Sequence, residues 1–369
     1  MAITQIVQSA RTIDAASIAK AASIPAFMVS ADSHATEPDS LWKDMPSKLR
    51  DQLPLFKGRA NRPVGATDPK ERIKDMDKDK VSAEVLYPDR GLGTFVAVPE
   101  VQELSFHLYN EWLADYCKYS PKRLFGITAV SCYDIDKAIK EMQRGHDLGL
   151  HGVLIWEVPD PRLPFSSPHY EKLWSAAEEL GEPINLHILT GFLKKPPHAD
   201  DTTERIRINT NARNDDTLNA LFDFIWTGVF ERHPKLKLGM IESEIGWAPF
   251  MLQQWDYYYE RALKTTPEIA NFKMSRKPSE VFNDHVFATF MDDYYGTHQL
   301  SIWGQNNCMW SSDYPHPNMT WPDSRAFVAK QISELSRPVQ NRLLSENVIG
   351  LYNLDVDRTV AQKFQQAAE

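Results

Sequence analysis

Apolar positions along this chain fall into short runs that alternate with longer stretches of helical periodicity. The short runs are rich in Val, Ile, Leu and Phe, which is typical of buried strands. They predict strands at residues 26–32, 82–88, 125–131, 151–157, 183–189, 236–242, 285–290 and 307–313. The stretches between them place apolar residues three and four positions apart, which predicts amphipathic helices. These helices are predicted at residues 71–81, 99–124, 134–150, 167–181, 214–234, 246–263 and 324–336.

The regular alternation of strands and helices predicts parallel strands joined by right-handed crossovers. About eight such units in a chain of 369 residues, with no G-x-G-x-x-G motif, favour a closed (β/α)8 TIM barrel over an open sheet. We expect residues 1–25 to form an N-terminal arm and residues 26–369 to form a single barrel domain. A polar, proline-rich stretch at 38–70 predicts an irregular excursion after the first strand.

Charge and composition exclude several classes of protein. The net charge is −9 and no long basic run occurs, which argues against a nucleic-acid-binding surface. No stretch approaches the roughly 18 consecutive apolar residues of a membrane span, and the N-terminus lacks the apolar segment of a secretory signal. Three scattered cysteines predict buried free thiols in a cytoplasmic protein. The N-terminal arm suggests contact with a partner subunit, so we expect a homo- or hetero-oligomer.

Candidate chemistry lies where the predicted strands end. The segment "VSADSHATEP" closes the first strand, and the period of two sends Asp32 and His34 to the same side. Later strands end on His187, Glu242 and Asp313. The active site of such a barrel lies at the C-terminal ends of its strands, and converging polar groups are costly to bury without a compensating charge. Imidazole and carboxylate ligands therefore predict a divalent metal site, held by these side chains.

Motifs spread over nearly the whole chain carry a family resemblance. They are "SADSHATEPDSLW" (30–42), "RIKDMDKDKVSAEVLYP" (72–88), "INLHILTG" (184–191), "VFERHPKLKLGMIESEIGWAPFMLQQWD" (229–256), "KPSEVF" (277–282), "MWSSDYPHPNMTWP" (309–322) and "ENVIGLY" (346–352). With these motifs the chain resembles the amidohydrolase-related family that includes aminocarboxymuconate-semialdehyde decarboxylase and other non-oxidative decarboxylases. The resemblance implies a metal-dependent (β/α)8 barrel acting on a small carboxylated or aromatic molecule.

The resemblance also assigns individual residues. Asp32 and His34 stand for the ligand pair of strand one, His187 for the ligand of strand five, and Asp313 for a carboxylate of strand eight that also acts as general base. Two positions depart from the family pattern. Asp32 stands where a histidine or glutamate is usual, and Glu242 stands where strand six usually carries a proton-donating histidine. A subgroup with "DSHxxEP" and "ES-x-IGW" shares both changes.

The number and kind of metal ions stay open at this point. Zinc is the expected ion, while the oxygen-rich donor set also suits manganese or iron. Glu37 is either a further ligand or a residue that caps or salt-bridges the following turn. With Glu37 and Glu242 included, the donors suffice for a dinuclear site.

Other residues are candidates for catalysis or substrate binding. His298 is a candidate acid/base group, and His316 either orients Asp313 or contacts the substrate. Arg90 and Arg276 are candidates for binding a substrate carboxylate, with exposed surface charge as the alternative. Trp310 either lines an apolar pocket or fills the core.

Three functions are compatible with these residues. The favoured one is a mononuclear metal-dependent hydrolase or non-oxidative decarboxylase, in which the metal activates a water or polarises a substrate oxygen. The first alternative is a dinuclear iron or manganese oxygenase on the same barrel. The second is a non-catalytic, metal-binding subunit of a hetero-oligomer.

Overall fold

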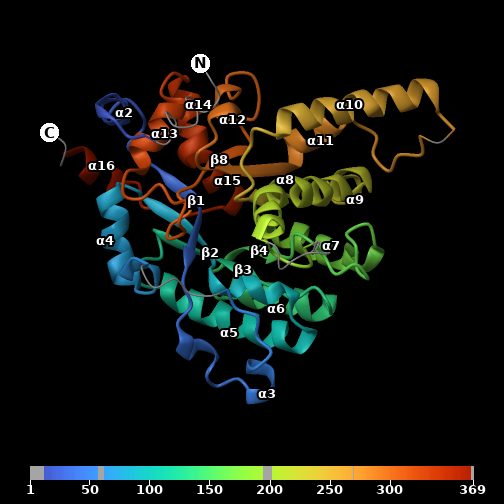
Figure 1. The fold of residues 1–369 in the computed structure, drawn as a ribbon, viewed down its shortest axis with the longest axis horizontal. Coiled ribbons are helices and arrows are strands. Elements are labelled where there is room, and N and C mark those ends of the chain that lie inside the picture. The colour runs from blue at the N-terminus through green and yellow to red at the C-terminus, as the bar shows by residue number, and fades with distance from the viewer. Residues whose placement is uncertain (1–11, 57–61, 194–201, 269, 367–369) are drawn as a thin grey trace.

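The computed structural model describes residues 12–56, 62–193, 202–268 and 270–366. Eight strands form one sheet in the order β1-β2-β3-β4-β5-β6-β7-β8, and each pairs in parallel with the next (Figure 1). They span Val29–Ala35, Ala83–Pro88, Leu124–Ala129, His151–Ile155, Ile184–His187, Leu238–Ile241, Val286–Phe290 and Cys308–Trp310. The predicted (β/α)8 barrel is confirmed.

The barrel closes where β1 meets the segment that follows β8. The backbone N–H of Asp313 donates to the carbonyl of Asp32 at 3.1 Å, and the N–H of His34 donates to the carbonyl of Tyr314 at 2.6 Å. The first strand extends three residues beyond its predicted end at Asp32, and its last residues carry these bonds. Backbone hydrogen bonds therefore join β1 to the segment that follows β8. Three of the four residues that make these bonds, Asp32, His34 and Asp313, are predicted metal ligands.

Helices surround the sheet, and several of their ends follow from local sequence. The α-helices of the described chain are α2 (Ala15–Ala21), α3 (Ser47–Arg50), α4 (Pro69–Asp79), α5 (Pro99–Cys117), α6 (Ile135–Asp147), α7 (Glu171–Leu180), α8 (Thr202–Trp226), α9 (Val229–Arg232), α10 (Ala248–Thr265), α11 (Pro278–His285), α12 (Tyr294–His298), α13 (Ser324–Ile332), α14 (Arg337–Asn341), α15 (Asn347–Tyr352) and α16 (Thr359–Gln366). Asp68 caps α4 by accepting the N–H of Lys70 at 2.8 Å, with Pro69 at the first helical position. The predicted helix 214–234 is in fact α8 and α9, because Gly228 adopts a left-handed φ of 74° between them.

The structure shows short helical turns in the predicted excursion (38–70) and packs the described part of the N-terminal arm (12–25) on the barrel. The excursion contains the short helix α3 and two 3-10 turns, η1 (Asp39–Trp42) and η2 (Val64–Ala66). In the arm, α2 packs against α13 of the same chain (Figure 1), and Arg325 donates to the carbonyls of Ala21 and Pro25 at 2.9 and 3.0 Å. The described part of the arm thus lies on its own barrel, and contact with a partner subunit stays a prediction.

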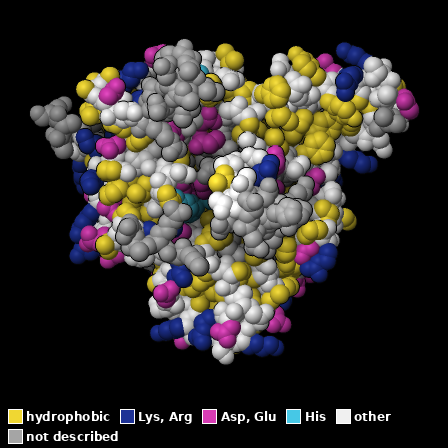
Figure 2. Space-filling view, in the orientation of Figure 1, with side chains coloured by type: hydrophobic (Ala, Val, Ile, Leu, Met, Phe, Trp, Pro, Cys, Tyr) yellow, Lys and Arg dark blue, Asp and Glu magenta, His cyan; other side chains and the backbone are white. Residues whose placement is uncertain are grey.

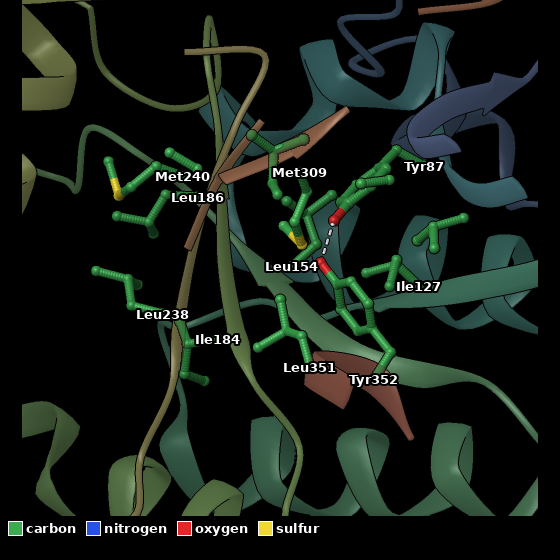
Figure 3. Packing of buried hydrophobic residues seen from close by; sticks show 14 of the residues in the cluster. Tyr87, Ile127, Leu154, Ile184, Leu186, Leu238, Met240, Met309, Leu351 and Tyr352 are labelled. Carbon is green, nitrogen blue, oxygen red and sulfur yellow. Dashed lines mark hydrogen bonds between the residues drawn. The ribbon is translucent and has the colours of Figure 1, made fainter. Parts of the chain in front are cut away.

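The barrel wall is lined on both sides by buried side chains (Figure 3). Inside, the hydroxyls of Tyr87 and Tyr352 lie 2.8 Å apart, and Tyr352 donates to Asn185 Oδ1 at 2.6 Å. The carbonyl of Tyr352 bonds to Nδ1 of His151 at the start of β4, so α15 closes the N-terminal end of the barrel. Access to the interior is therefore from the C-terminal ends of the strands.

Two further findings concern the whole described chain. The three cysteines, Cys117, Cys132 and Cys308, are buried free thiols, as predicted. Among the described residues, none of the helices has the length and apolar character needed to cross a bilayer.

Candidate metal centre

Side chains from four strand ends converge at the C-terminal mouth of the barrel. Asp32 and His34 lie in β1, His187 ends β5, Glu242 follows β6, and Asp313 follows β8. Potential ligand atoms within 4.8 Å of one another define two overlapping groups in the described residues. The groups are Asp32, His34, His187 and Glu242, and His34, Glu242, Asp313 and His316.

The donor atoms have the spacing of ligands around a common centre. His34 Nε2 lies 3.5 Å from Asp32 Oδ1 and 3.4 Å from Asp313 Oδ1. His187 Nε2 lies 3.8 Å from Asp32 Oδ1 and 3.5 Å from Glu242 Oε2. Atoms that each bind one ion at about 2.1 Å lie roughly 3–4 Å apart, so these separations fit a single divalent cation.

Both histidines are held in the tautomer that a metal requires. Nδ1 of His34 lies 2.7 Å from the carbonyl of Pro88, and Nδ1 of His187 lies 2.9 Å from the carbonyl of Ile188. A carbonyl only accepts, so each Nδ1 carries the hydrogen and each Nε2 presents a lone pair. Both Nε2 atoms are buried and make no hydrogen bond within the described residues. Buried acceptors of this kind are costly unless a cation binds them.

The electrostatics of the centre also suit a cation. Burial lowers the pKa of His34 to about 4 and that of His187 well below its ordinary value, so both imidazoles are neutral at pH 7. Burial by itself would raise the pKa of Asp313, but the imidazole of His316 outweighs it and holds that pKa below its usual range. The centre therefore combines neutral imidazoles with an ionised carboxylate.

Backbone strain gathers at the same strand ends. Glu242, Glu244 and Asp313 have φ of 58°, 55° and 54°, a left-handed conformation that non-glycine residues rarely adopt. Each such residue costs on the order of 1–3 kcal/mol and persists only where its surroundings enforce it. The N–H of Glu242 donates to Thr289 Oγ1 at 2.7 Å, and Glu244 accepts the N–H of Met291 at 3.1 Å. The strained turn thus directs Glu242 to the centre and Glu244 to the neighbouring loop.

His316 adds an imidazole beside the donors. Its ring stacks on that of His34 with centroids 3.8 Å apart, and its Nδ1 lies 2.8 Å from Asp313 Oδ1. Its Nε2 lies 3.4 Å from Asp89 Oδ1. Burial would lower the pKa of His316, but Asp313 outweighs it and raises that pKa. His316 therefore links the carboxylates of Asp89 and Asp313.

Comparison with known proteins places the chain in a family. Residues 31–354 match the amidohydrolase family. The chain belongs to the amidohydrolase family. It is therefore an enzyme of the metal-dependent hydrolase and lyase class, as the sequence predicted. A curated relative, the gamma-resorcylate decarboxylase of Rhodococcus jostii, is 24% identical over 299 residues, covering 77% of this chain and 87% of the relative.

Solved structures share the fold of this amidohydrolase. The 5-carboxyvanillate decarboxylase of Sphingomonas paucimobilis is 20% identical, with a TM-score of 0.70 over 89% of this chain and 99% of that one. The 5-carboxyvanillate decarboxylase of Novosphingobium aromaticivorans is 17% identical, with a TM-score of 0.70 over 89% and 96%. The latter structure contains manganese and 4-hydroxy-3-methoxy-5-nitrobenzoic acid. The expectation of zinc finds no support in these relatives.

Glu37 lies outside both groups of potential ligands in this amidohydrolase. Its carboxylate accepts the backbone N–H groups of Asp89, Arg90 and Gly91 at 3.2, 2.8 and 3.1 Å. Glu37 thus holds the turn after β2, rather than the turn that follows it in sequence, where the structural alternative had placed its contacts. Arg90 sits on that turn and donates to Asp39 Oδ1 at 2.6 Å.

Two predicted substrate contacts lie away from the centre. Arg276 pairs with Asp284 beside Lys237, just before β6, and so lies at the N-terminal end of the barrel. Trp310 is fully buried in β8. Because Met309 points into the barrel (Figure 3), the alternation of the strand turns Trp310 toward the helices. The structure brings neither residue to the metal centre.

His298 is likewise not brought to the centre. It is exposed at the end of α12, and its Nδ1 lies 2.7 Å from the carbonyl of Tyr294. The centre itself is open to solvent through Glu242 and His316, whose side chains are 10% and 17% exposed. Figure 2 shows acidic and histidine side chains together in a recess near the middle of this face.

Asp89 is a site residue that the sequence analysis missed. It directly follows β2, so the same rule that selected His187 and Asp313 also applies to it. Its position in the segment "YPDR" was the available signal.

Proposed function

We propose that this protein is a manganese-dependent, non-oxidative decarboxylase that removes the carboxylate of a small hydroxylated aromatic acid. The observation that carries the proposal is the pair of buried Nε2 lone pairs, on His34 and His187, that face carboxylates at the barrel mouth. The decarboxylases among the relatives supply the reaction class and the substrate class.

The residues present fit one manganese ion. Asp32, His34, His187 and Glu242, whose ligand atoms lie within 4.8 Å of one another, would hold it, and Asp313, from the overlapping group that shares His34 and Glu242, would be a further ligand. A set rich in carboxylate oxygen suits manganese better than zinc. When bound, the ion supplies positive charge that attracts the acidic substrate and stabilises charge that develops on it. A single ion is favoured because Nδ1 of each histidine is engaged by a carbonyl and Glu37 is engaged by three N–H groups.

The reaction needs one proton. When the bond between ring carbon and carboxylate breaks, its electron pair stays on the ring carbon, CO2 leaves, and a proton replaces it. We assign that proton to the Asp313–His316 pair, joined at 2.8 Å beside the centre. His316 delivers it through Asp313 to the ring carbon, and Asp89 at the far nitrogen of His316 supports the charged imidazole. Glu242 pairs with His187, which favours a role in holding the ion over one in proton transfer.

An anaerobic assay tests the proposal. Manganese-loaded protein is incubated without oxygen with 2,6-dihydroxybenzoate, with 5-carboxyvanillate, with benzoate, and with the methyl ester of 2,6-dihydroxybenzoate. We expect CO2 and the matching phenol from at least one hydroxylated acid, and no product from benzoate. Asp313→Asn, checked for retained manganese, should lose at least about 100-fold in rate. Hydrolysis of the ester without CO2, or turnover that a parallel assay finds only in diiron-loaded protein with oxygen, would contradict it.

A further inference from the structure

A buried ion pair lies directly behind the metal centre. Arg72 of α4 is fully buried, and its Nε lies 2.5 Å from Oε2 of Glu84 in β2. Its NH1 group donates to the carbonyl of His34 at 2.8 Å, and its guanidinium carbon lies 4.3 Å from the centre of the Tyr314 ring. A buried ion pair is weak evidence for stability, because the cost of removing both charges from water offsets their attraction.

The contacts of this pair fall on both sides of the barrel seam. His34 in β1 donates its N–H to the carbonyl of Tyr314, and Asp313 donates its N–H to the carbonyl of Asp32. Tyr314 directly follows Asp313, and its hydroxyl donates to a carboxylate oxygen of Asp75, also in α4. Arg72 therefore touches the backbone of one proposed ligand and the neighbour of another.

We propose that Arg72 is a positioning residue that sets the distance between His34 and Asp313 across the seam. The planar guanidinium allows one side chain to make three contacts at fixed angles: to Glu84, to the His34 carbonyl and to the Tyr314 ring. Lysine offers a point charge on a flexible stem and cannot make all three at once. This inference rests on the proposed metal centre, and its readout needs no substrate.

The test is manganese affinity in Arg72→Lys. Metal-free protein is titrated with MnCl2 alone, and unbound Mn²⁺ is followed by its electron paramagnetic resonance signal. Circular dichroism and thermal unfolding of the metal-free protein are measured alongside. Arg123→Lys is the matched control, because Arg123 is also buried and donates to carbonyls, those of Ser82 and Val81, without contacting any proposed ligand.

We expect Arg72→Lys to weaken manganese binding about 10- to 100-fold, the usual effect of losing a residue that orients a ligand. Arg123→Lys should bind manganese like wild type, whatever its effect on unfolding. Glu84→Gln, which keeps the shape but removes the charge partner, should weaken binding in the same direction and serves if Arg72→Lys does not fold.

Three outcomes would overturn the inference. If the folded Arg72→Lys and Glu84→Gln variants bind manganese with unchanged affinity, the role of Arg72 is wrong while the proposed metal centre stands. The same holds if Arg123→Lys loses as much manganese affinity as Arg72→Lys. Wild-type protein that binds no manganese would overturn the proposed metal centre, and this inference with it.

Discussion

Replacing Asp79 by asparagine should stabilise the protein at alkaline pH, relative to wild type, by an amount that vanishes toward acid. Asp79 ends α4 and is only 4% exposed. It accepts the backbone N–H of Ser324 at 2.9 Å and the hydroxyl of the same residue, so a side chain of α4 caps α13. Burial raises the pKa of Asp79 to about 7, and the carboxylates of Glu84 and Asp323 add to the rise.

The sign and size of the effect follow from linkage. The pKa of the unfolded carboxyl is 3.8, so between pH 4 and 7 folding takes up a proton and stability falls as pH rises. Each pKa unit corresponds to about 1.4 kcal/mol of unfolding free energy. About two units of the rise in the Asp79 pKa lie above pH 5, so that part of the effect is measured between pH 5 and pH 9. Wild type should therefore lose about 3 kcal/mol against Asp79→Asn between pH 5 and pH 9. Asparagine keeps both bonds to Ser324, accepting one and donating the other.

The assay is urea unfolding of the metal-free protein at pH 5, 7 and 9, followed by circular dichroism. The quantity compared is the difference in unfolding free energy between variant and wild type, in which other titrating groups cancel. Asp44→Asn controls for the loss of one negative charge, because Asp44 is exposed and is not among the carboxylates that raise the pKa of Asp79. A difference that stays constant from pH 5 to pH 9 would show that Asp79 is ionised throughout in the fold, and the reasoning would fail.

Three further substitutions separate the roles assigned at the barrel mouth. His187→Gln should weaken manganese binding at least about 100-fold, because it removes a ligand rather than its support; equilibrium dialysis with metal analysis checks this, and retained binding would remove His187 from the site. At pH 5, Glu37→Gln should lower the unfolding free energy by about 1–3 kcal/mol, because the amide nitrogen cannot accept from the N–H groups that Glu37 binds. Burial raises the pKa of Glu37 to about 7, so this loss should shrink as the pH rises. The same variant should keep the manganese stoichiometry, and a lost equivalent of metal would make Glu37 a ligand after all. His298→Ala should leave kcat/KM within about twofold, because its exposed ring contacts Tyr294 of α12 and belongs to neither group of potential ligands in the described residues; a larger loss would return it to the acid/base candidates.

The sequence predicted the strand ends because two simple rules agree there. The period of two placed Asp32 and His34 on one side of β1, and chain order placed His187 and Asp313 at the same mouth. The conformations of Glu242 and Asp313 were beyond reach, because a left-handed φ in a glutamate or aspartate has no local sequence signal. The roles of Glu37 and His316 could not be predicted either, because they depend on contacts with residues that are distant in the sequence.

Sequence features could have excluded two of the substrate-binding candidates, Arg276 and Trp310, from the barrel mouth. Arg276 precedes α11, which leads directly into β7, and it pairs with Asp284 two residues before that strand, so it lies at the end of the barrel opposite the active site. Trp310 sits one position from an inward methionine, so alternation turns it outward. Arg72 gave no sign of its role, because a lone arginine in an amphipathic helix usually faces solvent.

The barrel seam has a consequence for the timing of metal capture in the cell. Asp32 and His34 are among the first residues of the domain to leave the ribosome, whereas Asp313 emerges after the eighth strand. A nascent chain that lacks its last barrel unit has Asp32, His34, His187 and Glu242 but not Asp313, and it lacks the bond between the N–H of His34 and the carbonyl of Tyr314. If the proposed manganese site is correct, its ligand set is complete only after the last barrel unit has folded, so a translation product truncated before the eighth strand should bind the metal more weakly than the whole chain.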